Sequence, residues 1–344
     1  MQKIVAEIHL ANIRYNARLF KERCNTRLCA VVKANAYGHG AEEVTLALSD
    51  IADCFAVALV DEGMQIRQAA CGKDILVFAP PITEEEAYTL IVNGFIVSLS
   101  DLWTAKLLTR VCKRYRLTAR AHIKVNTGMN RYGVDPYKLE GLCQFLAENP
   151  YIRVEGVYSH LYREDEHTAR RQRDIFLQAQ SLCKRYFSSF ISHLSATYGA
   201  TLGEDFSLDM VRIGLGLYGY SPIPLTLKKG MSVRAQVVGN RRCVWGGVGY
   251  GEKIARKGER IFLLRGGYAD GFLRKARNGA DGYEQNANNL CMDVCLRKGN
   301  EKRGAWISLL TDAAQTARLM DTIPYEVLCA ATRRAELVYD YEEC

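Results

Sequence analysis

Lys33 ends a short apolar run, Leu28–Lys33, that the sequence predicts to be a buried strand. Burial disfavours the charged ammonium and lowers the pKa of a lysine, so the neutral amine becomes available as a Schiff-base nucleophile. The alternative is an ordinary strand-end lysine that extends its amine into solvent. The next seven residues, ANAYGHG, favour the nucleophile, because their two glycines permit a turn that brings the backbone close to a ligand.

The elements that must position Lys33 alternate along the first two thirds of the chain. Short strand-like runs are apolar throughout, as expected for parallel strands buried on both faces. Longer stretches with helical periodicity separate them, and several begin with capping patterns such as Thr83 to Glu86 or with Pro136. The eight predicted strands are Leu28–Lys33, Cys54–Val60, Ile75–Ala79, Ile96–Leu99, Ala121–Val125, Val154–His160, Phe190–Leu194 and Met210–Leu217.

Eight strands that alternate with helices predict an α/β fold with an N-terminal (β/α)8 TIM barrel. A doubly wound open sheet is the alternative, but its G-x-G-x-x-G turn is missing after the first strand. Active sites of barrels lie at the carboxyl ends of the strands, which is where Lys33 stands.

The pattern of strand-like and helical segments changes after about Lys228, where short apolar segments alternate with glycine-rich turns. These segments predict a smaller, mainly-β C-terminal domain, with one short helix at Ala313–Leu319. The proline-containing segment 221–224 is the predicted linker, so we expect a barrel over residues 1–224 and a β domain over residues 225–344. The predicted strands here are Val233–Val238, Arg260–Leu264, Leu290–Leu296 and Trp306–Leu310.

Composition and charge exclude several classes of protein. The 344 residues are 48% hydrophobic and 24% charged, which is typical of a globular protein and excludes a disordered or collagen-like chain. No apolar run approaches the ~18 residues of a membrane span. The net charge of +8 is scattered, so we expect no nucleic-acid partner, although an anionic small ligand suits a basic chain.

The termini and cysteines predict a cytoplasmic protein. Glu7 and His9 fall where a secretory signal peptide needs an apolar core. None of the twelve cysteines belongs to a C-x-x-C pair, so we expect free thiols in a reducing compartment rather than disulfides or a zinc site. No metal ligand set is predicted.

The motif around Lys33, VVKANAYGHG, resembles the pyridoxal 5'-phosphate (PLP) lysine motif of the alanine racemase family. The resemblance continues in the same order along nearly the whole chain. Further matching segments are HIKVNTGMNRYG at 122–133, YSH at 158–160, VRIGLGLYG at 211–219, VGYG at 248–251, GYADG at 267–271, CMD at 291–293 and TIPYE at 322–326.

This resemblance implies a PLP-dependent isomerase that converts L-alanine to D-alanine for peptidoglycan. It implies a homodimer whose active sites lie at the subunit interface. Racemisation removes a proton from one face of Cα and returns one to the other, which calls for two bases. By resemblance, Lys33 binds the cofactor and is the base on one face, and Tyr250 of the partner subunit is the base on the other. Without that resemblance, Tyr250 is an ordinary core tyrosine of the β domain.

Arg212 has a distinctive role by resemblance, because it faces the pyridine nitrogen of PLP. Arginine is always charged and cannot accept a proton, so the nitrogen stays unprotonated and the ring is a weaker electron sink. This disfavours most other PLP chemistries, in which a carboxylate faces that nitrogen. His160 matches a residue of the polar chain that joins Arg212 to the catalytic tyrosine.

Other matched positions concern the two anionic groups of cofactor and substrate. A phosphate dianion is held by N–H groups and hydroxyls, and the matching residues are Tyr37, Thr197, Gly214, Leu215 and Tyr325. Arg131 and the backbone N–H of Met292 match groups that bind the substrate carboxylate. Lys124 matches a lysine that is carbamylated in some members and orients Arg131; the alternative is an interior lysine paired with an acid.

The chain departs from the family pattern at Asn126, Ala196, Ile213 and His9, where Asp, Asn, Pro and Asp are usual. Ala196 lacks a polar group beside the cofactor, which would loosen PLP binding. The stretch 275–289 lacks the usual strand pattern, and 298–310 is shortened, so the Met292 contact and the domain boundary depend on weaker matches.

Three alternatives stay open at this point. A serine or broad-spectrum racemase of the vancomycin-resistance type differs mainly in pocket preference, and Tyr325, which narrows the pocket, favours alanine. A fold-related PLP decarboxylase is disfavoured by Arg212. A non-catalytic PLP-carrier protein shares the barrel and lysine but lacks Tyr250 and the second domain.

Overall fold

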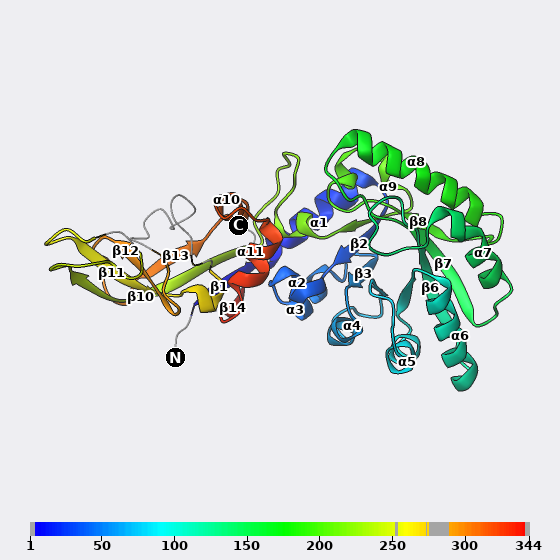
Figure 1. Ribbon diagram of the computed structural model, residues 1–344, viewed down its shortest axis with the longest axis horizontal. Coiled ribbons are helices and arrows are strands. Elements are labelled where there is room, and N and C mark those ends of the chain that lie inside the picture. The colour runs from blue at the N-terminus through cyan, green and yellow to red at the C-terminus, as the bar shows by residue number, and fades with distance from the viewer. Residues whose placement is uncertain (1–3, 252–253, 273, 275–288, 341–344) are drawn as a thin grey trace.

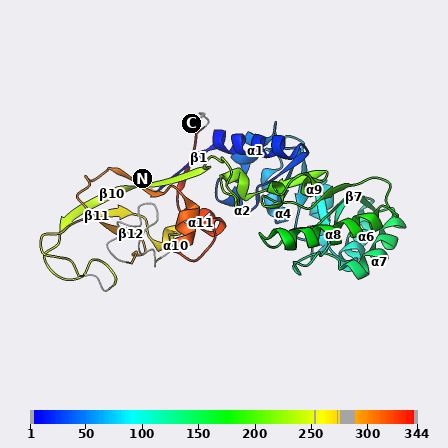
Figure 2. The same ribbon diagram turned by 90° about the horizontal axis from the view of Figure 1, so that it is seen from above.

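The computed structural model describes residues 4–251, 254–272, 274 and 289–340. The molecule is elongated, with an α/β barrel at one end and a β-rich body at the other (Figure 1). The same two bodies can be distinguished when the molecule is turned by 90° (Figure 2). This arrangement confirms the predicted fold class.

All eight predicted barrel strands are present and parallel. They form one sheet in the order β8-β7-β6-β5-β4-β3-β2-β9. Two backbone hydrogen bonds join its ends, from Asp209 N to Ser192 O (3.1 Å) and from Arg212 N to Ser195 O (2.9 Å), so the barrel is nearly closed. The strands are β2 (Arg27–Val31), β3 (Cys54–Val57), β4 (Asp74–Val77), β5 (Ile96–Leu99), β6 (Ala119–Lys124), β7 (Ile152–Tyr158), β8 (Ile191–His193) and β9 (Met210–Ile213).

Helices surround this barrel and begin where the capping patterns predict. The Thr83 hydroxyl accepts a hydrogen bond from Glu86 N (3.1 Å), Asp101 accepts one from Thr104 N (2.7 Å), and Pro136 is the first residue of its helix. The helices are α1 (Leu10–Cys24), α2 (Lys33–Tyr37), α3 (Ala41–Leu48), α4 (Val60–Ile66), α5 (Glu84–Val92), α6 (Leu102–Tyr115), α7 (Pro136–Ala147), α8 (Glu166–Cys183) and α9 (Glu204–Ser207), with 3₁₀ turns η1 (Gly199–Thr201) and η2 (Leu215–Tyr218).

The second body is a six-stranded sheet in the order β12-β11-β10-β1-β14, with β13 also paired to β10. Its helices are α10 (Ala313–Leu319), which was predicted, and α11 (Pro324–Ala331), which was not; η3 (Tyr268–Asp270) is a single turn. The strands are β1 (Val5–His9), β10 (Met231–Arg242), β11 (Arg260–Arg265), β12 (Val294–Lys298), β13 (Trp306–Leu310) and β14 (Glu336–Asp340).

The N-terminal strand β1 was not predicted, and it belongs to the second sheet. It pairs antiparallel with β10 and parallel with β14. From Val5 to His9 the chain therefore belongs to the β-rich body, and it then enters the barrel through α1. The division at residues 224 and 225 stays a prediction, and the stretch 275–288 lies outside the described residues.

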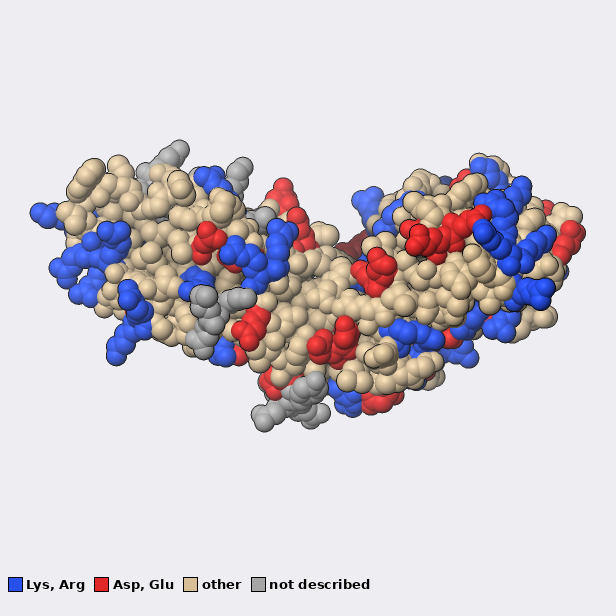
Figure 3. All heavy atoms as spheres, turned by 90° about the horizontal axis from the view of Figure 1, so that it is seen from below, with Lys and Arg blue, Asp and Glu red and all other residues tan. Residues whose placement is uncertain are grey.

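Two further features of the molecule are the charged side chains of its surface and its cysteine thiols. Basic side chains occur on both bodies with acidic side chains among them on the face in Figure 3. The described cysteines are all free thiols. Among the described residues, no helix is long and apolar enough to cross a membrane.

Candidate active site

A cavity of about 610 Å³ opens at the carboxyl ends of the barrel strands. Tyr325 of helix α11 and Ile323, which precedes that helix, close one side of it from the second body. The cavity brings together ten of the twelve site residues proposed from the sequence. They are Lys33, Tyr37, Lys124, Arg131, His160, Thr197, Arg212, Gly214, Leu215 and Tyr325.

Lys33 lies two residues beyond β2, not inside a strand as expected, and it begins a left-handed turn. Ala34, Asn35 and Ala36 all have φ near 52°, a conformation that costs a non-glycine residue roughly 1–2 kcal/mol. Glu62 stabilises this turn, because its Oε1 accepts a hydrogen bond from Ala34 N (2.7 Å). The turn aims Lys33 into the cavity instead of continuing along the strand.

The environment of Lys33 favours its neutral amine. Burial lowers the pKa of Lys33, and the positive charge of Arg131 lowers it further, while the carboxylate of Glu62 opposes the shift. A lysine with a lowered pKa is a better nucleophile and base near neutral pH.

Arg212 is the buried cation at the base of the cavity, with 2% of its surface exposed. Its Nη2 donates to the carbonyl oxygens of Ser159 (2.7 Å) and Leu194 (3.0 Å), and its Nη1 donates to Nδ1 of His193 (2.8 Å). His160 Nδ1 lies 3.4 Å from Nη2. These contacts fix the plane of the guanidinium.

A chain of two buried histidines extends from Arg212 into the barrel. Because arginine only donates, Nδ1 of His193 must accept. Neutral His193 then carries its proton on Nε2, which lies 2.9 Å from Nδ1 of His122 and donates to it. Burial lowers the pKa of His193 well below its usual range and that of His122 to about 4, so both rings are neutral at pH 7.

The ring of Tyr158 lies close to both Arg212 and Lys124. Its ring stacks on His193 at 4.7 Å with 5° between the planes, and its hydroxyl lies 2.6 Å from Ser98 Oγ. The Arg212 guanidinium carbon is 5.2 Å from the ring centroid, and the Lys124 amine nitrogen is 4.5 Å from it. The π face therefore lies within cation–π distance of both groups, and it stabilises the positive charge of Arg212.

Lys124 is buried and has no carboxylate ion-pair partner among the described residues. Burial, with the positive charges of Arg212 and Arg131, holds the pKa of Lys124 well below its usual range. The interior lysine paired with an acid, considered from the sequence, is therefore not what the structure contains. A neutral amine at this point is able to react with CO₂.

Arg131 is carried on an exposed loop that Asn126 organises. The Asn126 side-chain oxygen accepts from Gly128 N and Asn130 N (both 3.1 Å), and its nitrogen donates to Asp135 Oδ1 (2.9 Å). An aspartate here would lack that donor and would face the Asp135 carboxylate. The departure from the family pattern thus suits the local structure.

The other side of the cavity has hydroxyl groups and a glycine, Gly214, whose missing Cβ leaves free space. Thr197 Oγ1 accepts a hydrogen bond from Gly216 N (3.0 Å), which leaves its own hydrogen to donate. A Cβ at Gly214 would lie 2.6 Å from the Tyr37 hydroxyl oxygen, so glycine keeps this space open. Tyr37 packs at 5.5 Å from Tyr325, and burial raises the pKa of Tyr325 to about 12.

Tyr250 and Met292 do not reach this cavity. Tyr250 follows β10 and Met292 precedes β12, and 60% and 52% of their respective surfaces are exposed. Within one chain, the structure does not bring Tyr250 and Lys33 together.

The sequence of this chain matches two models of one protein family. Residues 8–222 match the family model described as alanine racemase, N-terminal domain, and residues 230–339 match the one described as alanine racemase, C-terminal domain. Together the two models cover nearly all of the sequence. The chain belongs to the alanine racemase family.

Individual relatives of the alanine racemase family are similar over their whole length. The alanine racemase of Symbiobacterium thermophilum is 31% identical, with 99% of this chain and 98% of the relative covered. That of Lactobacillus delbrueckii subsp. bulgaricus is 30% identical, with 97% of each chain covered.

Solved alanine racemase structures share the fold. The enzyme from the D-cycloserine producer Streptomyces lavendulae superimposes with a TM-score of 0.91 at 26% identity, covering 100% of this chain and 98% of the other. The one from Bartonella henselae, which carries covalently bound pyridoxal phosphate, gives 0.89 at 26% identity and covers 99% and 100%.

Sequence reasoning missed part of this alanine racemase site. Tyr158 was noted only within a matching motif, and His193 and Ser98 were not singled out. His122 and His193 do carry a signal, since each is a polar residue inside a predicted buried strand, as are Lys124 and Ser192. Their contact depends on the closure of the barrel, which no local pattern reports.

Proposed function

We propose that this chain, a PLP-dependent amino-acid racemase of the alanine racemase family, interconverts L- and D-alanine by a two-base mechanism. The observation that carries the proposal is the single cavity that holds the amine of Lys33 and the buried guanidinium of Arg212. A lysine with a lowered pKa is a base for Cα–H, and Arg212, which has no hydrogen-bond acceptor, cannot stabilise a protonated ring nitrogen as a carboxylate would.

The residues of the cavity fit PLP. The missing Cβ of Gly214 leaves room beside the Tyr37 hydroxyl, and Thr197 still has a hydrogen to donate, as a phosphate group requires. The Leu215 backbone and Tyr325 lie on the same side. We assign Lys33 to the covalent attachment of the cofactor and Arg212 to its pyridine nitrogen. PLP, when bound, withdraws electrons from Cα and so acidifies the Cα–H bond.

Lys33 exchanges a proton with one face of the substrate Cα in this mechanism. Burial and the charge of Arg131 lower the pKa of its amine, which favours the neutral form that can accept the proton. His160 and Arg212 form the polar floor beneath it, and the two hydrogen-bonded histidines keep Arg212 in place.

Tyr250 acts at the opposite face, and we propose that a partner subunit supplies it. The motivation is that Tyr250 is exposed and lies outside the cavity of its own chain. The functional unit is then a homodimer with two shared sites. The Met292 backbone N–H would enter the same site from the partner and, together with Arg131, bind the substrate carboxylate.

Arg131 and Lys124 complete the substrate side. Carbamylation of Lys124 would turn a buried amine into an anion next to Arg131, because the chemistry converts R–NH₂ and CO₂ into R–NH–COO⁻ and a proton. The anion would orient the guanidinium of Arg131 toward the substrate carboxylate. We also propose that the reaction takes place in the cytoplasm and supplies D-alanine for peptidoglycan.

Complementation between two inactive variants tests the shared site. Lys33→Ala and Tyr250→Phe are each expected to be inactive. In a mixed dimer one of the two sites has both residues intact, so co-expression should restore roughly a quarter of wild-type activity if subunits pair at random. If both bases came from one chain, the mixture would stay inactive, and the two-subunit proposal would be wrong.

The substrate is tested by racemisation of L-alanine and L-serine by PLP-saturated protein. A preference for alanine of about tenfold or more in kcat/KM, ~1.4 kcal/mol, supports the alanine assignment. Equal rates or a preference for serine would assign the broad-spectrum or serine branch. No turnover of either amino acid, with Lys33 still attached to PLP, would overturn the racemase proposal.

A further inference from the structure

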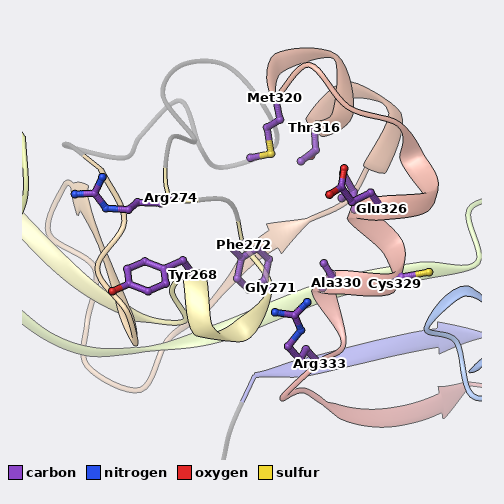
Figure 4. Close-up of a pocket in the computed structure, with 12 residues that line it drawn as sticks. Tyr268, Gly271, Phe272, Arg274, Thr316, Met320, Glu326, Cys329, Ala330 and Arg333 are labelled. Carbon is purple, nitrogen blue, oxygen red and sulfur yellow. The ribbon is translucent and has the colours of Figure 1, made fainter. Parts of the chain in front are cut away.

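A second cavity of about 310 Å³ lies in the β-rich body, between helices α10 and α11 and the residues Gly271, Phe272 and Arg274. Its wall has an apolar part, formed by Phe272, Met320, Val327 and Ala330. Figure 4 shows the side chains of Phe272, Met320 and Ala330 around the cavity, with Tyr268 and Arg274 extending away from its centre. The cavity is separate from the active-site cavity, because the two share no lining residue.

Thr316 gives this cavity an unsatisfied polar group. Only 1% of its surface is exposed, and its hydroxyl has no hydrogen-bond partner within the described structure. Figure 4 shows its side chain directed from α10 toward the cavity between Met320 and Glu326. A buried hydroxyl without a partner costs free energy, and a ligand atom in the cavity would satisfy it.

Two charged side chains of opposite sign complete the wall. Glu326 lies near Thr316, with Oε2 accepting a hydrogen bond from the Thr322 hydroxyl, so the carboxylate is held in place. Arg333 lies two residues beyond the C-terminal end of α11, and its side chain extends toward Phe272 (Figure 4). Arg333 makes no ion pair within 4 Å to any residue that the structure describes. A carboxylate and a guanidinium thus flank one apolar wall.

We infer that this cavity binds a small zwitterion with an apolar body, an apolar amino acid or a dipeptide. The ammonium group pairs with Glu326 and donates to the Thr316 hydroxyl, and the carboxylate pairs with Arg333. The apolar part packs on Phe272 and Met320. Cavities of this size and composition are typical of small-molecule sites. Helix α11 would contact this ligand with one face while Tyr325 contacts the active-site cavity.

Calorimetric titration of the PLP-saturated protein tests this site, with L-leucine in one arm and L-alanyl-L-alanine in the other. Binding in the first arm alone identifies an amino-acid site, and binding in the second alone identifies a dipeptide site. Thr316→Val, Glu326→Gln and Arg333→Gln are each expected to weaken binding at least about tenfold. Absence of binding in both arms would overturn the inference.

Thr45→Val is the matched control, because Thr45 is also fully buried with an unpartnered hydroxyl but lies on α3, outside this cavity. Both valine variants are expected to keep the wild-type melting temperature without ligand, since neither removes a hydrogen bond. Only Thr316→Val should lose ligand binding. If both probes bound equally well to Thr316→Val and Arg333→Gln, they would be occupying the active site, and the inference would be wrong. None of these readouts depends on racemisation.

Discussion

Nη1 of Arg212 lies 2.8 Å from Nδ1 of His193. This one contact determines which ring nitrogen carries the proton in two neutral histidines. Since the guanidinium only donates, His193 must hold its proton on Nε2 and pass a hydrogen bond to His122. The arrangement keeps a buried arginine oriented without a carboxylate beside it.

Substitution of His193 tests this contact. His193→Leu removes the acceptor and leaves a buried Arg212 donor unsatisfied, which costs roughly 1–3 kcal/mol. We expect kcat/KM for alanine racemisation to fall about 10–100-fold. His193→Asn keeps an oxygen near the position of Nδ1 and should retain more activity. Steady-state kinetics at saturating PLP measure the difference, and equal activity of the two variants would argue against the role of this acceptor.

Gly214→Ala should weaken cofactor binding. The new Cβ would lie 2.6 Å from the Tyr37 hydroxyl oxygen, and the backbone of Gly214 (φ −114°, ψ −91°) lies outside the α and β regions that alanine prefers, so both the cavity and the local backbone would have to adjust. Overpacking of this kind costs about 1–3 kcal/mol, so the Kd for PLP should rise at least about tenfold. Gly141→Ala on α7 is the control, since its Cβ meets nothing within 4 Å. Titration of each apoprotein with PLP, followed by absorbance, gives the two constants.

Lys124 should carry a carbamate in the presence of CO₂. Its amine has a lowered pKa because of burial and two nearby arginines, and only the neutral amine reacts. We expect a carbamate signal in carbon-13 NMR after addition of labelled bicarbonate, and a severalfold fall in kcat/KM when CO₂ is removed. Lys124→Gln should lack the signal, while Lys138→Gln, at an exposed position on α7, should keep it. A wild-type spectrum without the signal would rule the modification out.

Acid should destabilise this protein well before its carboxylates are protonated. Burial lowers the pKa of His39 and of His122 to about 4, and it lowers that of His193 as well. The unfolded chain therefore binds more protons than the folded one between about pH 6.5 and about pH 4. Each such histidine contributes stability above pH 6.5 that is lost across this window, at up to ~1.4 kcal/mol per pH unit.

Urea unfolding at a series of pH values measures this dependence. His39→Asn removes one titrating group but can still donate to the backbone carbonyls that His39 Nδ1 contacts, so its pH slope should be shallower. His167→Gln, at an exposed position on α8, should keep the wild-type slope. A slope that is the same in all three proteins would contradict the assignment.

The sequence by itself determined the barrel strands and the motif residues, because both depend on local patterns. Continuous apolar runs specify strands that are buried on both faces, and Gly38 and Gly40 permit the positive φ angles of 84° and 90° that the chain adopts there. Ten of the twelve proposed site residues line one cavity because the carboxyl ends of parallel strands converge in a barrel.

Only the tertiary structure decided the contacts between distant segments. Val5–His9 lacks a pattern of its own and becomes a strand because β10 and β14 lie on either side of it. His122 and His193 are 71 residues apart and touch only because β6, β7 and β8 are adjacent. The left-handed turn after Lys33 is another case, since Ala34 and Ala36 have no intrinsic preference for positive φ. A hydrogen bond from Glu62, 28 residues away from Ala34, stabilises that turn, and such long-range energy is invisible in a local pattern.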